Sequence, residues 1–170
     1  QQGTAHAVLQ TSKYWKDKEG MLLVMNGDTP FVEPSTVTEF VGAHVNAGVS
    51  ASVLTAVLDD PSGYGRILRG PQQEFEKIVE DRDATPEIKL IREINAGIYC
   101  FTLHDFESVL RDVTPQNAQG EYYITDTISI IRSRGGFVHA HCVPDAWEVH
   151  GINTSKDLAE AEAILRRRGS

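Results

Sequence analysis

The chain has 170 residues, of which 41% are hydrophobic and 24% are charged, and 16 Lys and Arg against 24 Asp and Glu give a formal net charge of −8. This composition is typical of one soluble globular domain covering residues 1–170, and it argues against a broad basic surface for nucleic acid. No apolar run reaches the length of a membrane span, and we expect no signal peptide.

Helix-like and strand-like patterns alternate along the chain, beginning with a predicted helix at residues 4–15 and a strand that ends at Asp28. The later elements, in chain order, are a helix at 34–46, strands at 49–58, 66–68 and 75–79, a short helix capped by Thr85, a strand at 93–101, helices at 103–113 and 124–132, a strand at 137–143, and a helix at 155–168 whose start Ser155 can cap. This alternation predicts an α/β fold with a mixed sheet, in one domain without internal repeats.

The stretch from Leu22 to Pro30 is the most informative part of the sequence. Four apolar residues precede Asn26-Gly27-Asp28, which predicts a strand buried on both faces of a parallel sheet. Ligands of open α/β sheets bind beyond the carboxyl ends of the strands, where Asp28 would hold a divalent metal against phosphate oxygens and Gly27 would admit a ligand close to the backbone. The alternative is that Asp28 only starts a turn.

Three further segments place glycine or polar residues beside predicted strands. Gly63-Tyr64-Gly65 predicts either a tight turn that brings backbone amides to a ligand or a plain hairpin turn. Glu80 ends a strand, and either accepts hydrogen bonds from sugar hydroxyls or lies in a solvated charged loop. Asn95 is unusual inside a strand, and either binds a polar ligand or marks a local bulge.

Two segments near helix starts also allow two interpretations. Tyr122 and Tyr123 precede Thr125 and Asp126, and this mixture of aromatics and hydroxyls is common in sugar clefts, although Thr125 or Asp126 can equally cap a helix. Asn153 offers either a hydrogen bond or an oxygen ligand to a metal, or it caps the last helix.

Other possible chemistry is weaker. His139 and His141 fall on one face of a predicted strand, but no second Cys/His cluster accompanies them, which disfavours a zinc site. Cys100 and Cys142 have no CxxC spacing, so we predict reduced, buried thiols in a cytoplasmic protein, with a disulfide as the alternative. The residues contain no P-loop and no GxGxxG, and no Ser-His-Asp or Cys-His arrangement stands out.

In this order, several short segments resemble the nucleotide-sugar pyrophosphorylases. They are Gln2–Ala7, Asn26–Pro30, Gly63–Ile67, Ile78–Glu80, Glu93–Ile98, Asn117–Asp126 and Gly151–Asn153. The run Asn-Ala-Gln-Gly-Glu-Tyr-Tyr at 117–123 is the most specific. The last four of these segments together narrow the resemblance, which spans nearly the whole chain, to the uridylyltransferase domain of the bacterial bifunctional N-acetylglucosamine-1-phosphate uridyltransferases/glucosamine-1-phosphate acetyltransferases. The resemblance implies a Rossmann-like nucleotidyltransferase fold with a mixed, mainly parallel sheet flanked by helices.

The resemblance also implies an enzyme, a sugar-1-phosphate nucleotidyltransferase that makes UDP-N-acetylglucosamine and pyrophosphate from UTP and N-acetylglucosamine 1-phosphate with Mg²⁺, for peptidoglycan and lipopolysaccharide synthesis in the cytoplasm. The implied site residues are Gly3 and Thr4 against the uracil, Asn26 and Gly27 beside the nucleotide, Asp28 and Asn153 as Mg²⁺ ligands, and Gly65, Glu80 and Asn95 around the sugar. No catalytic side chain is assigned, because the family's Gly-rich loop and phosphate-neutralising Lys do not occur in these residues.

The departures from the family shape the remaining expectations. The Gly-rich loop would lie upstream of Gly3, the first residue is Gln rather than Met, and Ala96 stands where the family more often has Thr. We also expect the acetyltransferase domain, through which the parent would form trimers, to lie outside these 170 residues. We therefore expect an N-terminally truncated domain that is inactive or nearly so alone, or that self-associates through exposed sheet edges. A pyrophosphorylase for another base or sugar is the other alternative.

Overall fold

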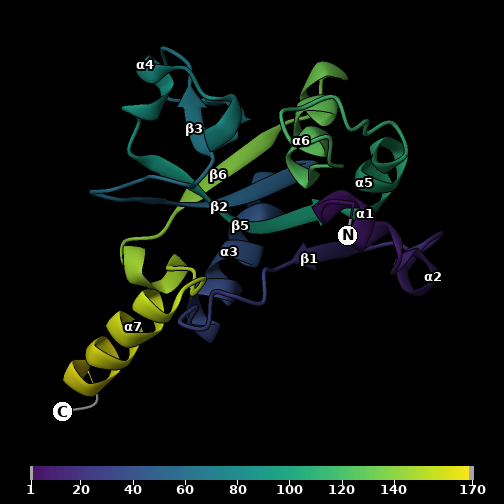
Figure 1. Ribbon diagram of the computed structural model, residues 1–170. Coiled ribbons are helices and arrows are strands. Elements are labelled where there is room, and N and C mark those ends of the chain that lie inside the picture. The colour runs from purple at the N-terminus through teal and green to yellow at the C-terminus, as the bar shows by residue number, and fades with distance from the viewer. Residues whose placement is uncertain (1, 169–170) are drawn as a thin grey trace.

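The longest strand, β5, lies at the centre of a six-stranded mixed sheet (Figure 1). The computed structural model describes residues 2–168. The strands are β1 (Met21–Val24), β2 (Ala51–Val57), β3 (Arg66–Arg69), β4 (Phe75–Val79), β5 (Glu93–Thr102) and β6 (Val138–Cys142). One edge of β5 pairs with β2, and the other edge pairs with β3 near its start and with β1 near its end. β4 extends the sheet beyond β3, and β6 extends it beyond β2.

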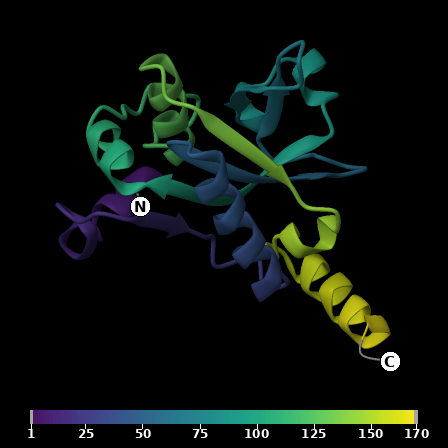
Figure 2. The ribbon, with the colours of Figure 1, turned by 180° about the vertical axis from the view of Figure 1, so that it is seen from behind.

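Helices cover both faces of this sheet. They are α1 (Thr4–Leu9), α2 (Ser12–Trp15), α3 (Pro34–Ala47), α4 (Pro86–Lys89), α5 (Leu103–Leu110), α6 (Ile124–Ser133) and α7 (Ser155–Arg168), with 3₁₀ turns η1 (Asp81–Asp83) and η2 (Ala146–Val149). α3 lies on one face, and α1, α5 and α6 lie on the other, while α7 projects away from the sheet (Figures 1 and 2).

Side chains along β5 alternate between two apolar clusters, as the period of a strand requires. Ile94, Ile98 and Cys100 pack in the cluster that contains Phe40 of α3. Phe101 packs in the other cluster, where several residues of α5 and α6 meet it. Both clusters are almost completely removed from water, so this strand joins the two halves of the core.

The predicted mixed α/β architecture is confirmed, but the prediction that the sheet is mainly parallel is wrong for the described residues. Only β2 and β6 pair in parallel, and β5 is antiparallel to β1, β2 and β3. The crossover through α3 does make β1 and β2 point the same way, as a βαβ unit should. β5 then inserts between them in the opposite direction. Local sequence does not predict this strand order.

Three local predictions also need correction. β1 is only partly buried, and Met21 is 45% exposed, so it is not a strand buried on both faces. The helix predicted at 4–15 is two short helices that separate at Gln10 and Thr11. Ser155 does not cap α7: the side chain of Thr154 accepts from the amide of Asp157 at 3.2 Å.

Candidate active site

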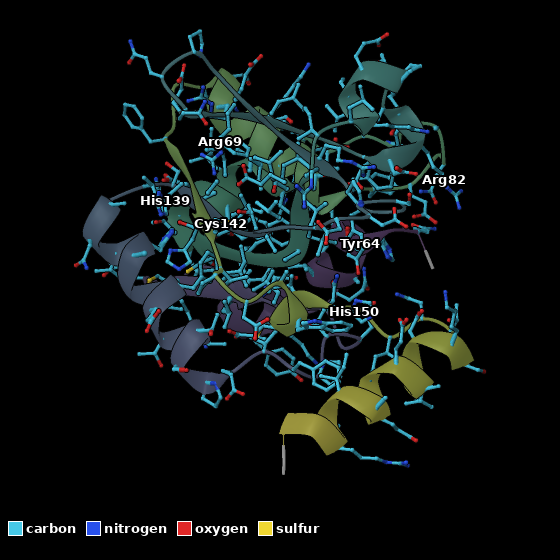
Figure 3. The ribbon with its side chains drawn as sticks, turned by 90° about the vertical axis from the view of Figure 1, so that its left-hand side faces the viewer. Tyr64, Arg69, Arg82, His139, Cys142 and His150 are labelled. Atoms are coloured by element: carbon cyan, nitrogen blue, oxygen red, sulfur yellow. The ribbon has the colours of Figure 1, made fainter. Side chains whose placement is uncertain are left out.

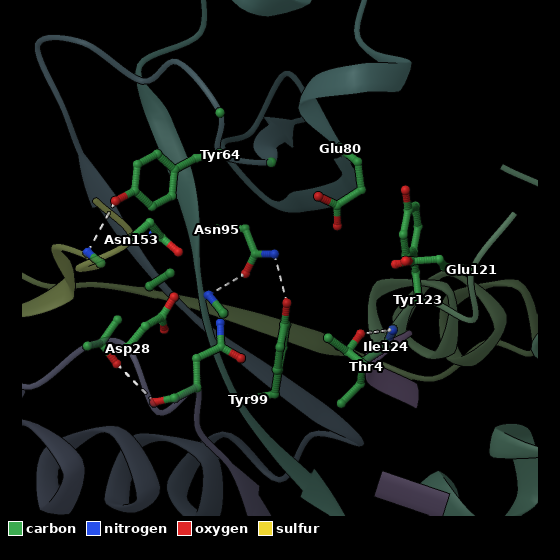
Figure 4. A pocket seen from close by; sticks show the side chains of 17 residues that line it. Thr4, Asp28, Tyr64, Glu80, Asn95, Tyr99, Glu121, Tyr123, Ile124 and Asn153 are labelled. Carbon is green, nitrogen blue, oxygen red and sulfur yellow. Dashed lines mark hydrogen bonds between the residues drawn. The ribbon is translucent and has the colours of Figure 1, made fainter. Parts of the chain in front are cut away.

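A cleft opens at one edge of β5, in the gap between the part that pairs with β1 and the part that pairs with β3. The loop after β1, the turn before β3 and the middle of β5 form its walls (Figure 4). The lining residues are Thr4, Asn26, Asp28, Thr29, Gly63, Tyr64, Gly65, Glu80, Asn95, Ala96, Gly97, Tyr99, Glu121, Tyr123, Ile124, Gly151 and Asn153. Its volume of about 230 Å³ lies below the roughly 300 Å³ that begins the range for drug-sized ligands, so it fits a fragment such as one sugar ring.

A bulge in β5 forms the floor of this cleft. The pairing moves from Thr55 opposite Asn95 to Val53 opposite Tyr99, so β5 takes four residue steps where β2 takes two. Gly97 makes this possible with φ of 73°, a conformation that favours glycine. A Cβ at Gly97 would lie 2.2 Å from Nδ2 of Asn26, so the glycine also admits that side chain. The bulge predicted as one alternative for Asn95 is therefore confirmed, and it lies in the lining of the cleft.

One wall of the cleft brings Gly65 next to Glu80. The amide of Asn95 donates to the carbonyl oxygen of Gly65 at 2.8 Å, and a Cβ at Gly65 would lie 3.2 Å from Oε2 of Glu80. The hydroxyl of Thr125 donates to Oε1 of Glu80 at 2.9 Å, so Thr125 orients this carboxylate and does not cap α6. Burial, and then the nearby carboxylate of Asp126, raise the pKa of Glu80 above its usual range.

The opposite wall brings Asp28 and Asn153 together around Gly151. A Cβ built on Gly151 would lie 3.1 Å from Nδ2 of Asn153 and 3.6 Å from Oδ2 of Asp28, and the amide of Gly151 donates to the hydroxyl of Tyr64 at 3.3 Å. The amide of Ile152 donates to the carbonyl oxygen of Asp28 at 2.8 Å, which ties the two loops to each other.

One carboxylate oxygen on this wall lacks a hydrogen bond. Oδ1 of Asp28 is buried and accepts no hydrogen bond from the described residues, an arrangement that costs free energy unless a ligand completes it. The amides of Asn153 and Thr154 both donate to Asp157, so helix capping does not consume the side chain of Asn153. A hard divalent cation fits such a donor set, with oxygens from Asp28 and Asn153 and the remaining positions left to a ligand and water.

The charge of the cleft also favours a cation. Its lining includes Asp28, Glu80 and Glu121, and no Lys or Arg. The guanidinium of Arg66, next to the cleft in sequence, is buried against the carbonyl oxygen of Tyr64 and the carboxylate of Asp81, which lies 3.2 Å away. A phosphate entering this cleft would meet uncompensated negative charge unless a metal accompanied it.

The N-terminal segment contributes through backbone pairing with the loop before α6. The hydroxyl of Thr4 accepts from the amide of Ile124 at 2.9 Å. A residue outside α6 thus provides a hydrogen-bond partner for one of the free N–H groups in the first turn of that helix. Gly3 has φ of 108°, and a Cβ there would lie 2.5 Å from the carbonyl oxygen of Tyr122. Gly3 is therefore required by this pairing.

The structure brings most of the predicted site residues into one cleft. Those that line it are Thr4, Asn26, Asp28, Gly65, Glu80, Asn95 and Asn153. Gly3 and Gly27 do not line the cleft, although each is next in sequence to a residue that does. Sequence reasoning assigned no role to Tyr99 or Gly151, and the one sequence feature that points to Tyr99 is its distance of two residues from the glycine of the bulge.

The other predicted groups lie elsewhere. His139 and His141 lie on β6 with ring centroids 6.1 Å apart, and within residues 2–168 no three His, Cys, Asp or Glu side chains gather as metal ligands. Figure 3 shows His139 and Cys142 along β6, apart from Tyr64. Cys100 and Cys142 are both free thiols, so the predicted alternative of a disulfide is wrong. Cys100 is buried as predicted, but the prediction of burial is wrong for Cys142, which is exposed near the end of β6. None of the described helices combines the length and apolar character that crossing a membrane requires.

Comparisons with known proteins agree with this geometry. The profile of the nucleotidyl transferase family matches residues 1–167. The bifunctional proteins GlmU of Geobacillus thermodenitrificans and of Acetivibrio thermocellus are 48% and 45% identical to this chain over 168 residues. These alignments cover 99% of this chain but 37% and 36% of the two relatives, so the chain spans little more than a third of their length.

A solved structure shares the fold. It is a candidate glucose-1-phosphate thymidylyltransferase from Bacillus anthracis in complex with a sucrose, with a TM-score of 0.71, 24% identity, and coverage of 96% of this chain and 61% of that one. At this identity the likeness concerns the fold alone. The family match over almost the whole chain and the cleft described above lead to one conclusion: this protein belongs to the nucleotidyl transferase family.

Proposed function

We propose that the cleft binds a nucleotide sugar together with a divalent cation, and that this chain serves the transfer of a uridylyl group from UTP to N-acetylglucosamine 1-phosphate. The products would be UDP-N-acetylglucosamine and pyrophosphate, and the cation Mg²⁺. The observation that carries this proposal is the buried Oδ1 of Asp28, which accepts no hydrogen bond within the described residues and lies in a cleft lined by amides and carboxylates without a basic side chain.

The donors and acceptors around the bulge suit a sugar. Asn95 presents an amide with both a donor and an acceptor, Glu80 presents a carboxylate, and Gly65 leaves room at its backbone. We assign the sugar ring to this wall and the phosphates to the side where Asp28 and Asn153 lie. Thr4 and Gly3 would lie beside the uracil, and Asn26 and Gly27 beside the nucleotide.

Transfer requires an oxygen of the sugar phosphate to attack the α-phosphorus of UTP, while pyrophosphate leaves on the opposite side. The part of this chain in that step is to position: Asn95 and Glu80 orient the sugar, and Asp28 and Asn153 fix the charge-neutralising ion. Bound Mg²⁺ would neutralise phosphate charge that the acidic cleft itself cannot stabilise.

Binding and turnover should separate in this chain. Its 170 residues contain no Gly-rich phosphate loop with a Lys, so we expect UDP-N-acetylglucosamine to bind while pyrophosphate release stays near background. An assay of pyrophosphate release with UTP, N-acetylglucosamine 1-phosphate and Mg²⁺ tests this directly. Robust turnover by these residues alone would contradict it.

Base and sugar specificity are tested by calorimetric titration. UDP-N-acetylglucosamine with Mg²⁺ should bind more tightly than UDP-glucose or dTDP-glucose with the same metal. A preference for either competitor would replace the proposed substrate by that of another pyrophosphorylase. No saturable binding of any nucleotide sugar would remove the proposal altogether.

Two further proposals concern location and association. We infer a cytoplasmic location, supported by two free thiols that a reducing compartment preserves. Within residues 2–168, β1, β4 and β6 each pair with one strand only, and such edges invite pairing with a second copy. Light scattering at low and high concentration tests association, and a monomer throughout would contradict it.

A further inference from the structure

A tyrosine beneath the cleft makes a contact that a regular strand would forbid. In an extended strand, residues four apart lie roughly 13 Å from each other. The bulge brings Asn95 and Tyr99 so close that Nδ2 of Asn95 donates to the hydroxyl of Tyr99 at 2.7 Å (Figure 4). Both residues are buried, at 8% and 3% exposure, and both line the cleft.

This contact fixes which way the amide of Asn95 faces. Its Oδ1 accepts from the backbone amide of Gly97 at 3.0 Å, while its Nδ2 donates to Tyr99. The two bonds specify the positions of oxygen and nitrogen, because a flipped amide would place two donors face to face at Gly97. One N–H of the amide and one lone pair of Oδ1 then remain for a ligand.

The hydroxyl of Tyr99 has a proton of its own to give. It accepts from Asn95, and among the described residues no group accepts its proton. Burial holds the pKa of Tyr99 far above its usual value, with the negative charge of Glu80 adding to the shift, so the phenol stays a donor at every pH used for assays.

We propose that Tyr99 is a positioning residue for sugar recognition, which acts by holding the amide of Asn95 in one orientation. This inference rests on the proposed function, since the sugar is its ligand. It adds to that function a residue that acts through Asn95, on the sugar and not on the nucleotide.

The test compares Tyr99→Phe, which removes only the hydroxyl, with Tyr14→Phe, the same change at a tyrosine that is 65% exposed outside the cleft. By calorimetry with Mg²⁺, Tyr99→Phe should bind UDP-N-acetylglucosamine about tenfold more weakly than the unaltered chain, as expected for one buried hydrogen bond. Its affinity for UDP, which lacks the sugar, should change by less than about twofold. Tyr14→Phe should leave both affinities unchanged.

A double-mutant cycle separates positioning from a merely structural role. In the Asn95→Ala background, Tyr99→Phe should lose little further affinity, because the amide that it orients is gone. Equal losses in both backgrounds would overturn the proposal, as would an unchanged affinity for the nucleotide sugar in Tyr99→Phe. If the unaltered chain binds no nucleotide sugar, the proposed function fails first, and this inference fails with it.

A second measurement needs neither ligand nor variant. In the NMR spectrum of the unaltered chain, the side-chain amide protons of the buried Asn95 should exchange with water much more slowly than those of the exposed Asn46. A freely exchanging amide would contradict the fixed orientation, even if Tyr99→Phe failed to fold.

Discussion

The two halves of β5 behave differently, although they belong to one strand. From Cys100 to Thr102 the strand pairs with β1, Cys100 and Phe101 pair with β2 as well, and these two side chains fill the core. From Asn95 to Gly97 it bulges, places Gly97 in a left-handed conformation and, together with Tyr99, lines the cleft. The regular half stabilises the fold, while the irregular half gives up pairing and creates the site.

This difference separates stability from recognition within a few residues. Removing apolar contacts from the regular half should weaken folding without a direct effect on ligand contacts. Changing the bulge should weaken ligand binding more than folding. The predictions below are ordered from the largest expected effect to the smallest.

Phe101→Ala tests the regular half. Phe101 is completely buried, with its ring centroid 4.4 Å from that of Phe106 and 5.9 Å from that of Tyr99. Truncation should lower the free energy of unfolding by about 3–5 kcal/mol, because a cavity replaces the ring. Urea denaturation followed by circular dichroism measures this. A loss below about 1 kcal/mol would mean that this half does not carry the core.

Gly97→Ala tests the bulge. The new Cβ would meet the side chain of Asn26 in a backbone conformation that alanine disfavours, so affinity for UDP-N-acetylglucosamine should fall at least about tenfold. Gly135→Ala is the matched control, because Gly135 has φ of 85° and a Cβ there meets nothing within 4 Å. The control should show the conformational cost alone, with unchanged affinity. Equal binding by both variants would show that the bulge geometry is dispensable.

Glu80→Gln tests how ligand binding in the cleft depends on pH. Since the pKa of Glu80 is raised, its carboxylate should become protonated at a higher pH than an ordinary Glu, and sugar affinity should fall as pH drops through that pKa. The Gln variant should bind several-fold more weakly at neutral pH and lose this part of the pH dependence. Calorimetry between pH 5 and 8 measures both. The same pH dependence in Glu80→Gln would assign the effect to another group, such as Asp126.

His44 of α3 contacts the regular half of β5, and its protonation should have a small effect on stability. Its ring contacts the hydroxyls of Ser52 at 2.9 Å and Thr102 at 3.3 Å, and burial, then His139, lower its pKa. The neutral form of His44 is therefore favoured in the folded state. Its contribution to the free energy of unfolding is present above the unfolded pKa of about 6.5 and is lost as pH falls below that value. We expect the free energy of unfolding to decrease over this pH range in the unaltered chain, and this decrease to be absent in His44→Asn. Thermal melts that show no difference would contradict this.

The sequence predicted most of the helices and strands, because these depend on local patterns. Local patterns drew attention to Asp28 after an apolar run and to Asn95 inside an apolar strand, but their roles came from the resemblance to the pyrophosphorylases and stay predictions. The antiparallel insertion of β5 was not predictable, since strand order is set by contacts between distant segments. The role of Tyr99 was hidden for a related reason: regular strand geometry places it far from Asn95.

The central claim is that the unsatisfied oxygen of Asp28 is a metal ligand that a nucleotide sugar completes. The direct measurement is a Mn²⁺ titration followed by water-proton relaxation, with UDP-N-acetylglucosamine present, on the unaltered chain, on Asp28→Asn and on Asp17→Asn. Asp17 has an 81% exposed side chain and serves as the control.

We expect Asp28→Asn to bind Mn²⁺ at least about tenfold more weakly than the unaltered chain, as the loss of a charged ligand to a hard cation predicts, with no loss of thermal stability. Asp17→Asn should bind it normally. Equal Mn²⁺ affinity in the unaltered chain and in Asp28→Asn would contradict the account.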